Sequence, residues 1–349
     1  MAGAIFPVKK DFPAFVMYGF EESAVKNFLK RTGAKRAAIQ LPAGLGRHLP
    51  EIEAVFNRVG VETVFLADSC YGACDLADRA AKSLGCDVLV HYGHADMGLP
   101  SCLPTLYVEA RASKDPLDSV NRAISKLKFK RVGLVTTVQH VGYLEKISEL
   151  LLSRGIEPLI GKPGFRAKYP GQILGCDMGC AKSIAPKVDG FIYIGTGEFH
   201  PLGVTLATGK EVATINPISG DFRILDPEYK KFLGKRKAVI ARAALADKFG
   251  VLMSTKIGQR RLNLAKKLVN LLRKKGREAH LLAVDDVAPE KIGNFGLEAY
   301  VCVACPRIPI SDAERFEKPI LTPFELKVML GEAELEPYQI DEFSQEDSC

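Results

Sequence analysis

The sequence predicts an α/β fold made of three similar parallel-sheet domains with flanking helices. Short apolar, strand-like segments alternate with amphipathic helical segments along the chain, which is typical of parallel sheets covered on both faces. Clusters of turn-forming residues interrupt this alternation near 111–116 and 217–227. The 349 residues therefore divide into units of ordinary domain size. We expect domains at 1–113, 114–220 and 221–331, followed by an acidic tail at 332–349.

The elements of the first two units follow from runs rich in branched and aromatic residues bounded by turn signals. In the first unit these runs predict strands at 34–42, 61–68, 86–93 and 103–110, with helices at 49–60 and 75–85. In the second unit they predict strands at 131–137, 157–161, 189–195 and 211–217, with helices at 143–155 and 202–208.

The third unit repeats the pattern and adds a strongly basic helix. Strands are predicted at 249–255, 279–286, 298–306 and 319–322, with helices at 260–277 and 323–331. Between residues 230 and 277 there are 16 lysines and arginines and one acid, whereas 332–347 contains seven acids and no base. The basic helix is either an ordinary solvated face or a docking surface for an acidic or RNA-associated partner. The acidic tail could fold over it.

Composition indicates the compartment. The chain is 47% hydrophobic and 26% charged, as in ordinary soluble proteins. Its nine cysteines form no dense disulfide framework and fit a reducing environment. The N-terminus lacks the layout of a signal peptide, and no apolar run is long enough to span a membrane. We expect a cytoplasmic protein with no membrane association.

Three cysteines are the principal candidate ligands. Cys74, Cys176 and Cys305 each follow a predicted strand, and ligands of such sheets bind beyond the carboxyl ends of the strands. A single cysteine is more often a buried apolar residue than a ligand. Three thiolates meeting in one cleft would nevertheless hold a metal centre and leave a fourth position open.

The other cysteines are assigned from their spacing. Neither zinc-finger spacing nor a CxxxCxxC triplet occurs. Cys180, four residues after Cys176, competes with it as a ligand. Cys70 and Cys302 are expected in the core, with Cys302 facing away from Cys305. The remaining three have no companion pattern, and the last is expected to be a free surface thiol: Cys86, Cys102 and Cys349.

Glycine-containing loops follow several predicted strands. LPAGLGRHLP contains Gly44, GTGEFHPLG contains Gly197, and STKIGQRR contains Gln259. None matches a Walker loop or GxGxxG. Each is either a simple turn or a place where backbone amides approach a carboxylate or phosphate.

Five motifs in order, YGACDLAD, HYGHADMG, GQILGCDMGC, TKIGQRR and ACPRIPISD, closely resemble those of the archaeal-type diphthamide synthase family, the 2-(3-amino-3-carboxypropyl)histidine synthases. The resemblance extends over nearly the whole chain. It implies a pseudo-threefold arrangement of the domains around a central [4Fe-4S] cluster. It also implies that Cys74, Cys176 and Cys305 are the cluster ligands.

The resemblance further implies a transferase of the radical S-adenosylmethionine type. Such an enzyme breaks the bond between sulfur and Cγ of S-adenosylmethionine and releases methylthioadenosine. The 3-amino-3-carboxypropyl group is transferred to C2 of a histidine of elongation factor 2, the first step toward diphthamide. A homodimer, a separate electron donor and no nucleic-acid substrate are implied as well. We expect S-adenosylmethionine contacts from Gln259, Arg307, His94, Gly44 and Gly197.

Two other classes stay open at the level of sequence. One is a Lewis-acid dehydratase with a three-cysteine [4Fe-4S] cluster that resembles quinolinate synthase. The other is a nonenzymatic RNA- or ribosome-binding protein, with the basic stretch as its footprint.

Overall fold

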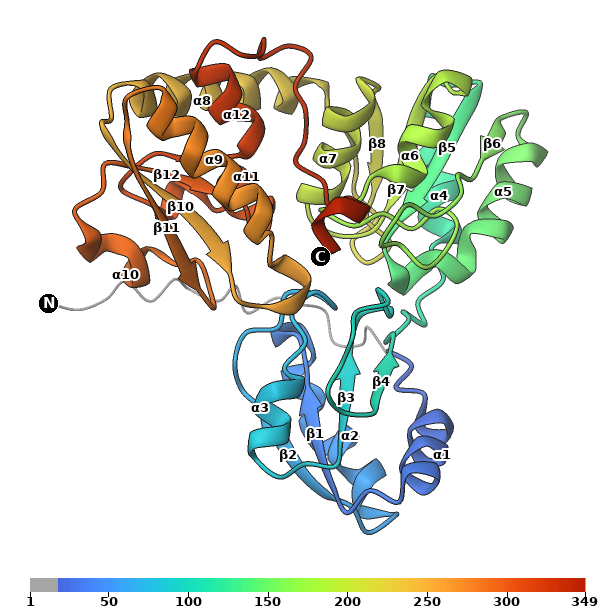
Figure 1. The fold of residues 1–349 in the computed structure, drawn as a ribbon. Coiled ribbons are helices and arrows are strands. Elements are labelled where there is room, and N and C mark those ends of the chain that lie inside the picture. Colours follow the sequence, from blue (N-terminus) through green and yellow to red (C-terminus); the bar gives the residue numbers. More distant parts are fainter. Residues whose placement is uncertain (1–17, 349) are drawn as a thin grey trace, which may run out of the picture.

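The structure, a computed structural model, describes residues 18–348. It contains three separate sheets, each forming its own lobe, and the three lobes meet at the centre of the molecule (Figure 1). The predicted α/β fold with three parallel-sheet domains is confirmed. In every sheet the first four strands lie in the order second, first, third, fourth.

The first sheet has strands that pair in parallel and are hydrogen-bonded in the order β2-β1-β3-β4. Every residue of β3 is buried, as expected of an inner parallel strand. Gly33, with φ of 64°, ends α1 in a left-handed conformation that favours glycine. The elements are α1 Glu22–Thr32, β1 Arg36–Gln40, α2 Leu49–Asn57, β2 Glu62–Leu66, α3 Asp78–Ser83, β3 Val88–Tyr92 and β4 Thr105–Val108.

The second sheet repeats this order and adds an antiparallel edge strand, β9, beside β8. Because β9 lies beyond residue 220, this sheet includes residues that the sequence assigned to the third domain. The elements are α4 Leu117–Ile124, β5 Arg131–Thr136, α5 Leu144–Ser153, β6 Glu157–Leu159, α6 Gly179–Ile184, β7 Gly190–Ile194, α7 Phe199–Thr208, β8 Val212–Ile215 and β9 Phe222–Ile224.

The third sheet is also parallel, in the order β11-β10-β12-β13. The basic helix α9 packs on β10 and β11 through Ala265, Leu268 and Leu272. The elements are α8 Asp226–Ala244, β10 Lys248–Ser254, α9 Leu262–Lys274, β11 Glu278–Val284, α10 Pro289–Ile292, β12 Ala299–Cys302, α11 Arg307–Ser311, β13 Ile320–Leu321 and α12 Pro323–Met329.

Alternate residues of each central strand enter different apolar clusters, so each sheet is covered on both faces. Val88 and Val90 belong to one cluster, whereas Leu89 belongs to another. The same alternation separates Val251 from Leu252 in the third sheet. Burial on both faces explains why the strands could be recognised as continuous apolar runs.

The acidic tail is not an independent segment. Asp341 and Asp347 form ion pairs with the buried Arg261, and Glu342 pairs with Lys182 of the second domain. Phe343 lies 3.8 Å below the guanidinium of Arg166. The tail thus lies between the second and third domains. Besides Arg261, it pairs with exposed cations of the basic stretch, since Glu332 contacts Lys275 and Glu336 contacts Lys237.

No helix within residues 18–348 is both long and apolar enough to cross a membrane. Cys349 and residues 1–17, which include the N-terminal segment assessed for a signal peptide, lie outside the described residues.

A buried ion pair connects α8 to the end of the third domain. Arg236 and Glu325 are 3% and 0% exposed and share two hydrogen bonds of 2.6 Å. The Tyr338 hydroxyl and the Thr322 amide also donate to this carboxylate. Without the carboxylate, a buried guanidinium would lose its counter-charge.

We therefore expect Glu325→Ala to lower the free energy of unfolding by about 3–5 kcal/mol, measured by urea denaturation. Glu314→Ala is the matched control, because Glu314 pairs with Lys235 of the same helix on the exposed surface. It should cost less than about 1 kcal/mol. Equal effects of the two variants would contradict this interpretation.

Candidate metal centre

Loops that follow the strands of all three sheets line one central cavity of about 460 Å³, a size usual for small-molecule sites. Its walls have a threefold pattern, since each sheet contributes loops after equivalent strands. Loops after the first strands supply Gln139 and Gln259, those after the second strands Cys74, Cys176 and Asp286, and those after the third strands His94, His200 and Cys305.

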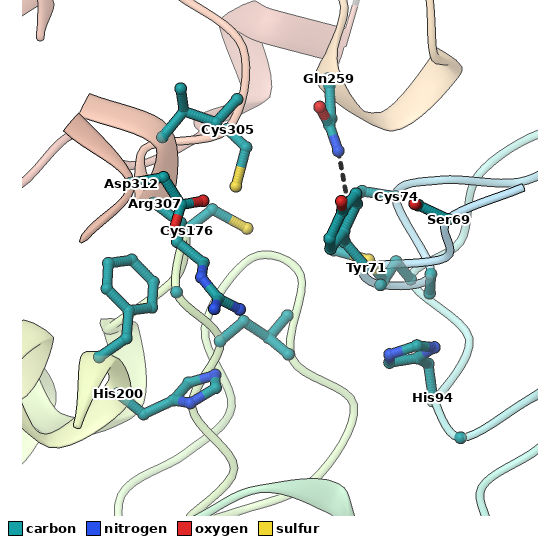
Figure 2. Close-up of a pocket in the computed structure, with 18 of the residues that line it drawn as sticks. Ser69, Tyr71, Cys74, His94, Cys176, His200, Gln259, Cys305, Arg307 and Asp312 are labelled. Carbon is teal, nitrogen blue, oxygen red and sulfur yellow. Dashed lines mark hydrogen bonds between the residues drawn. The ribbon is translucent and has the colours of Figure 1, made fainter. Parts of the chain in front are cut away.

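The three predicted cysteines share this cavity. Figure 2 shows the sulfur atoms of Cys74, Cys176 and Cys305 turned into the same space, and all three side chains are half-buried. Burial, followed by the charge of Cys74, raises the pKa of Cys176 to about 12. Burial and then Cys74 and Cys176 raise the pKa of Cys305. The thiolates would therefore repel one another unless a cationic group lay between them.

The spacing of the sulfurs fits a cluster better than a single ion. Two thiolates bound to one ion at 2.3 Å can be at most about 4.6 Å apart. The three sulfur atoms do not all lie within 4.8 Å of one another. Thiolate sulfurs bound to different iron atoms of one cluster can lie farther apart than this. The cavity thiols therefore fit a three-cysteine iron–sulfur cluster.

One residue of the TKIGQ loop, Gly258, follows β10 and holds the cysteine loops together. The Gly258 amide donates to the Cys74 carbonyl at 3.1 Å, and the Gly258 carbonyl accepts from Arg166 at 2.8 Å. The next side chain, Gln259, donates to the Cys74 sulfur at 3.4 Å. The Phe343 amide of the tail donates to the Cys176 carbonyl at 3.1 Å. All three domains and the tail therefore position the thiols.

The predicted cosubstrate residues divide into two groups. Gln259, Arg307 and His94 line the cavity with the cysteines. Gly44 lines a smaller cavity of about 250 Å³, of which His94 also forms part. Gly197 is exposed and is not among the lining residues of either cavity. The structure does not bring the two glycines to the thiols, and their part in cosubstrate binding stays a prediction.

The remaining cysteines lie apart from the cavity. Cys180 is buried in the core of the second domain, where its thiol donates to the Gly161 carbonyl at 3.5 Å. Cys302 is buried in β12, as expected of a core residue. Cys70 is buried too, but its sulfur lies 4.0 Å from Nε2 of His91 and so faces a polar group, which sequence did not predict.

Sequence reasoning missed Arg166, which belongs to a loop without a recognisable motif. Only the fold brings it to Gly258 and Phe343. His200 belongs to GTGEFHPLG and His91 to HYGHADMG. Both segments were recognised in the sequence, but neither histidine was predicted to have a function. His200 lines the cavity beside Arg307, whereas His91 lies behind His94.

Three thiols from three α/β domains, meeting in one cavity, define a protein of the class that can hold an iron–sulfur cluster. Residues 41–339 match the family model of diphthamide synthesis proteins, and the chain belongs to that family. It is 42% identical to the 2-(3-amino-3-carboxypropyl)histidine synthase of Pyrococcus horikoshii, with 94% of each chain covered.

Other relatives agree with this assignment. The synthase of Methanocaldococcus jannaschii is 30% identical, with 89% of this chain and 88% of the relative covered. The crystal structure of Dph2 from Pyrococcus horikoshii with a 4Fe-4S cluster superposes with a TM-score of 0.87, covering 93% of this chain and 94% of that one. Family membership favours the named synthases over both alternatives considered from sequence, the quinolinate synthase class and a nonenzymatic binding protein.

We expect Cys74→Ala, Cys176→Ala and Cys305→Ala each to lose the iron–sulfur absorption and most of the bound iron, because each removes one of three thiols facing the cavity. Cys180→Ala should keep both, since Cys180 bonds within the core. Iron analysis of anaerobically purified protein tests this. Loss of iron in Cys180→Ala with retention in Cys176→Ala would reverse the assignment.

A second prediction concerns the peptide that supports Cys74. A Cβ at Gly258 would lie 2.4 Å from Cα and 2.6 Å from the carbonyl oxygen of Cys74, so Gly258→Ala must displace the cysteine loop. We expect iron content to fall at least about fivefold, as a ligand moves from its place. Gly293→Ala in the same domain is the control, because no atom lies within 4 Å of the added Cβ. Normal iron content in Gly258→Ala would show that the loop tolerates displacement.

Proposed function

We propose that this protein catalyses the first step of diphthamide biosynthesis. In this proposal the 3-amino-3-carboxypropyl group of S-adenosylmethionine is transferred to C2 of a histidine of elongation factor 2, and methylthioadenosine is released. The observation that carries the proposal is the group of three thiols from three domains in one small-molecule cavity. Support comes from relatives named for the product, 2-(3-amino-3-carboxypropyl)histidine.

Cys74, Cys176 and Cys305 would hold the [4Fe-4S] cluster. With three protein ligands, such a cluster keeps one iron for the cosubstrate and supplies the electron that breaks a carbon–sulfur bond. Gln259 donates its amide hydrogen to the Cys74 sulfur. Hydrogen bonds to cluster sulfurs are one means by which a protein sets the reduction potential.

Arg307 is the candidate for the methionine carboxylate, because a guanidinium matches a carboxylate with two parallel hydrogen bonds. Its neighbour His200 does not compete as a cation. Burial, with the charge of Arg307 added, lowers the pKa of His200 to about 4, so this imidazole is neutral at pH 7. Fixing the carboxylate on one wall would determine which carbon attached to sulfur is presented for cleavage.

The protein substrate must place a histidine in the cavity. Tyr71 of the YGAC loop lines the cavity and is 62% exposed, which offers an aromatic contact to an incoming loop. The exposed Lys266, Lys267 and Lys274 of α9 are the candidates for steering an acidic surface of elongation factor 2. Arg261 is not among them, because it is buried against Asp341. A homodimer, an external electron donor and a cytoplasmic location belong to the same proposal.

Reduced protein incubated with S-adenosylmethionine should yield methylthioadenosine and little or no 5′-deoxyadenosine. The proposed reaction breaks the bond to the 3-amino-3-carboxypropyl carbon and leaves the bond to the adenosyl carbon intact. Chromatography of the small-molecule products measures the ratio. The variant Cys74→Ala, which lacks one of the three cavity thiols, is the control and should form neither product. Mainly 5′-deoxyadenosine from the wild type would overturn the proposed mechanism.

A further inference from the structure

A chain of hydrogen bonds leads from the first domain into the cavity. Gln40, at the end of β1, donates through Nε2 to the Asp75 carbonyl at 2.6 Å. Its Oε1 then faces the Ala77 amide at 3.2 Å and Nδ1 of His91 at 2.9 Å. Because Oε1 can only accept, Nδ1 of His91 must carry the hydrogen.

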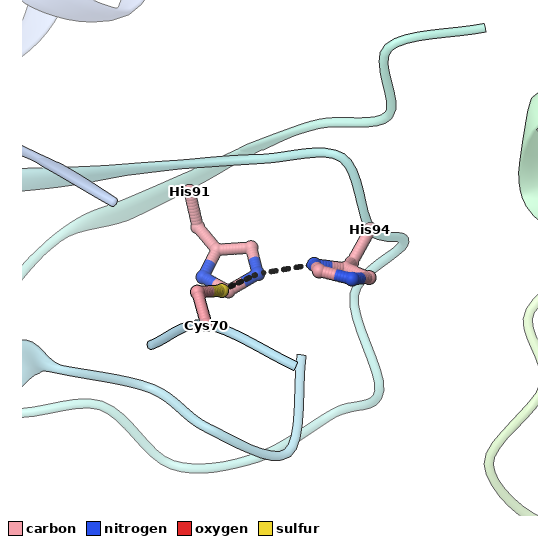
Figure 3. Close-up of side chains that lie close together, drawn as sticks. All are labelled: Cys70, His91 and His94. Carbon is pink, nitrogen blue, oxygen red and sulfur yellow. Dashed lines mark hydrogen bonds between the residues drawn. The ribbon is translucent and has the colours of Figure 1, made fainter. Parts of the chain in front are cut away.

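The hydrogen bond between His91 and His94 determines the tautomer of His94 in the same way. His91 is fully buried, and burial holds its pKa well below the usual value, so the ring is neutral. With hydrogen on Nδ1, its Nε2 is an acceptor. Nδ1 of His94 lies 2.9 Å from that Nε2 (Figure 3) and must donate to it. Nε2 of His94 is therefore the nitrogen with the lone pair.

His94 presents this lone pair at the cavity. Its ring lines the central cavity with Cys74 and Gln259, and Figure 2 shows it across from His200. The side-chain hydrogen bond of the His94 ring is made by Nδ1, to His91, which leaves Nε2 as the nitrogen turned toward the cavity contents. Burial lowers the pKa of His94 to about 4, which the Tyr92 carbonyl only partly offsets, so the ring is neutral at pH 7. A neutral imidazole with a free acceptor nitrogen is suited to accept a proton.

A metal ion explains the same side chains less well. Cys70, His91 and His94 place their ligand atoms within 4.8 Å of one another. Two nitrogens on a tetrahedral ion at 2.0–2.1 Å would be roughly 3.3 Å apart. The observed 2.9 Å between the imidazoles is the length of a hydrogen bond.

We propose that His94 is the base that takes the proton from C2 of the target imidazole, with His91 and Gln40 as its positioning residues. This inference rests on the proposed function. The sulfonium cosubstrate is cationic and both products are neutral, so each turnover releases one proton. The C2–H bond is replaced by a carbon–carbon bond. Cleavage of the carbon–sulfur bond takes one electron from the proposed iron–sulfur centre. The radical formed when the 3-amino-3-carboxypropyl group adds to C2 would return one electron to that centre as it loses this proton. The step therefore needs no further oxidant.

The first test needs neither cofactor nor substrate. Nitrogen-15 NMR of the cluster-free full chain with labelled histidine reports which ring nitrogen carries hydrogen. We expect hydrogen on Nδ1 and an unprotonated Nε2 for His94, assigned by the loss of its signals in His94→Asn. Gln40→Leu, which removes the acceptor for His91, should produce a mixture of tautomers. Hydrogen on Nε2 of wild-type His94 would overturn the proposal.

The second test separates bond cleavage from transfer. His94→Asn should modify elongation factor 2 roughly 10²–10⁴-fold more slowly, a far larger loss than any in its formation of methylthioadenosine from S-adenosylmethionine. Added imidazole should restore part of the transfer to His94→Ala, which a purely structural role for His94 would not allow. Cys180→Ala, which removes a thiol in the core of the second domain, is the control and should behave as wild type.

The possible outcomes are distinct. If the wild type forms no methylthioadenosine and modifies no histidine, the proposed function itself is wrong. If the wild type does both and His94→Asn transfers equally fast, only the role of His94 is wrong. Stoichiometric zinc in purified protein that disappears in Cys70→Ala would make His94 a metal ligand and also overturn the role proposed here.

Discussion

The central constraint on this molecule is that three loops from three separate domains must bring one thiol each to a common point. Gly258 makes this possible, because its amide donates to the Cys74 carbonyl and its carbonyl accepts from Arg166. The approach is so close that any side chain would collide with the backbone of the first domain. Around this glycine, Gln259 reaches the Cys74 sulfur and Phe343 reaches the Cys176 carbonyl. The cavity therefore depends on contacts between domains more than on any one domain.

The three sheets have the same strand order, but their equivalent loops carry different residues. Cys74 and Cys176 follow the second strands of their sheets, where the third domain has Asp286. Cys305 follows a third strand, where the other domains have His94 and His200. Similar domains thus present different chemistry at equivalent loops. The thiols occupy one part of the cavity, and neutral imidazoles and a guanidinium line another part.

Much of this could be predicted from sequence, because buried parallel strands are continuous apolar runs and the cysteines follow them. The three cysteines and the strand positions came from that pattern, and the motif resemblance supplied the cluster. The helices α1, α4, α6, α8, α10 and α11 were missed. In α8 the apolar positions do not form a clear stripe among many cations. Arg166 and the pairing of Arg261 with Asp341 were missed as well, since contacts between distant segments leave no local periodicity.

The order of the ligands along the chain has a consequence for biogenesis. A ribosome that has released only the first two domains has released two of the three thiols, and the Gly258 peptide that braces Cys74 is not yet present. The third thiol follows only at residue 305, and the amide that supports Cys176 comes from residue 343, later again in the order of synthesis. In the proposed enzyme, a cluster could therefore be inserted only after the third domain and residue 343 have joined the first two domains. A truncated product would expose thiols to oxidation without a finished site to receive iron.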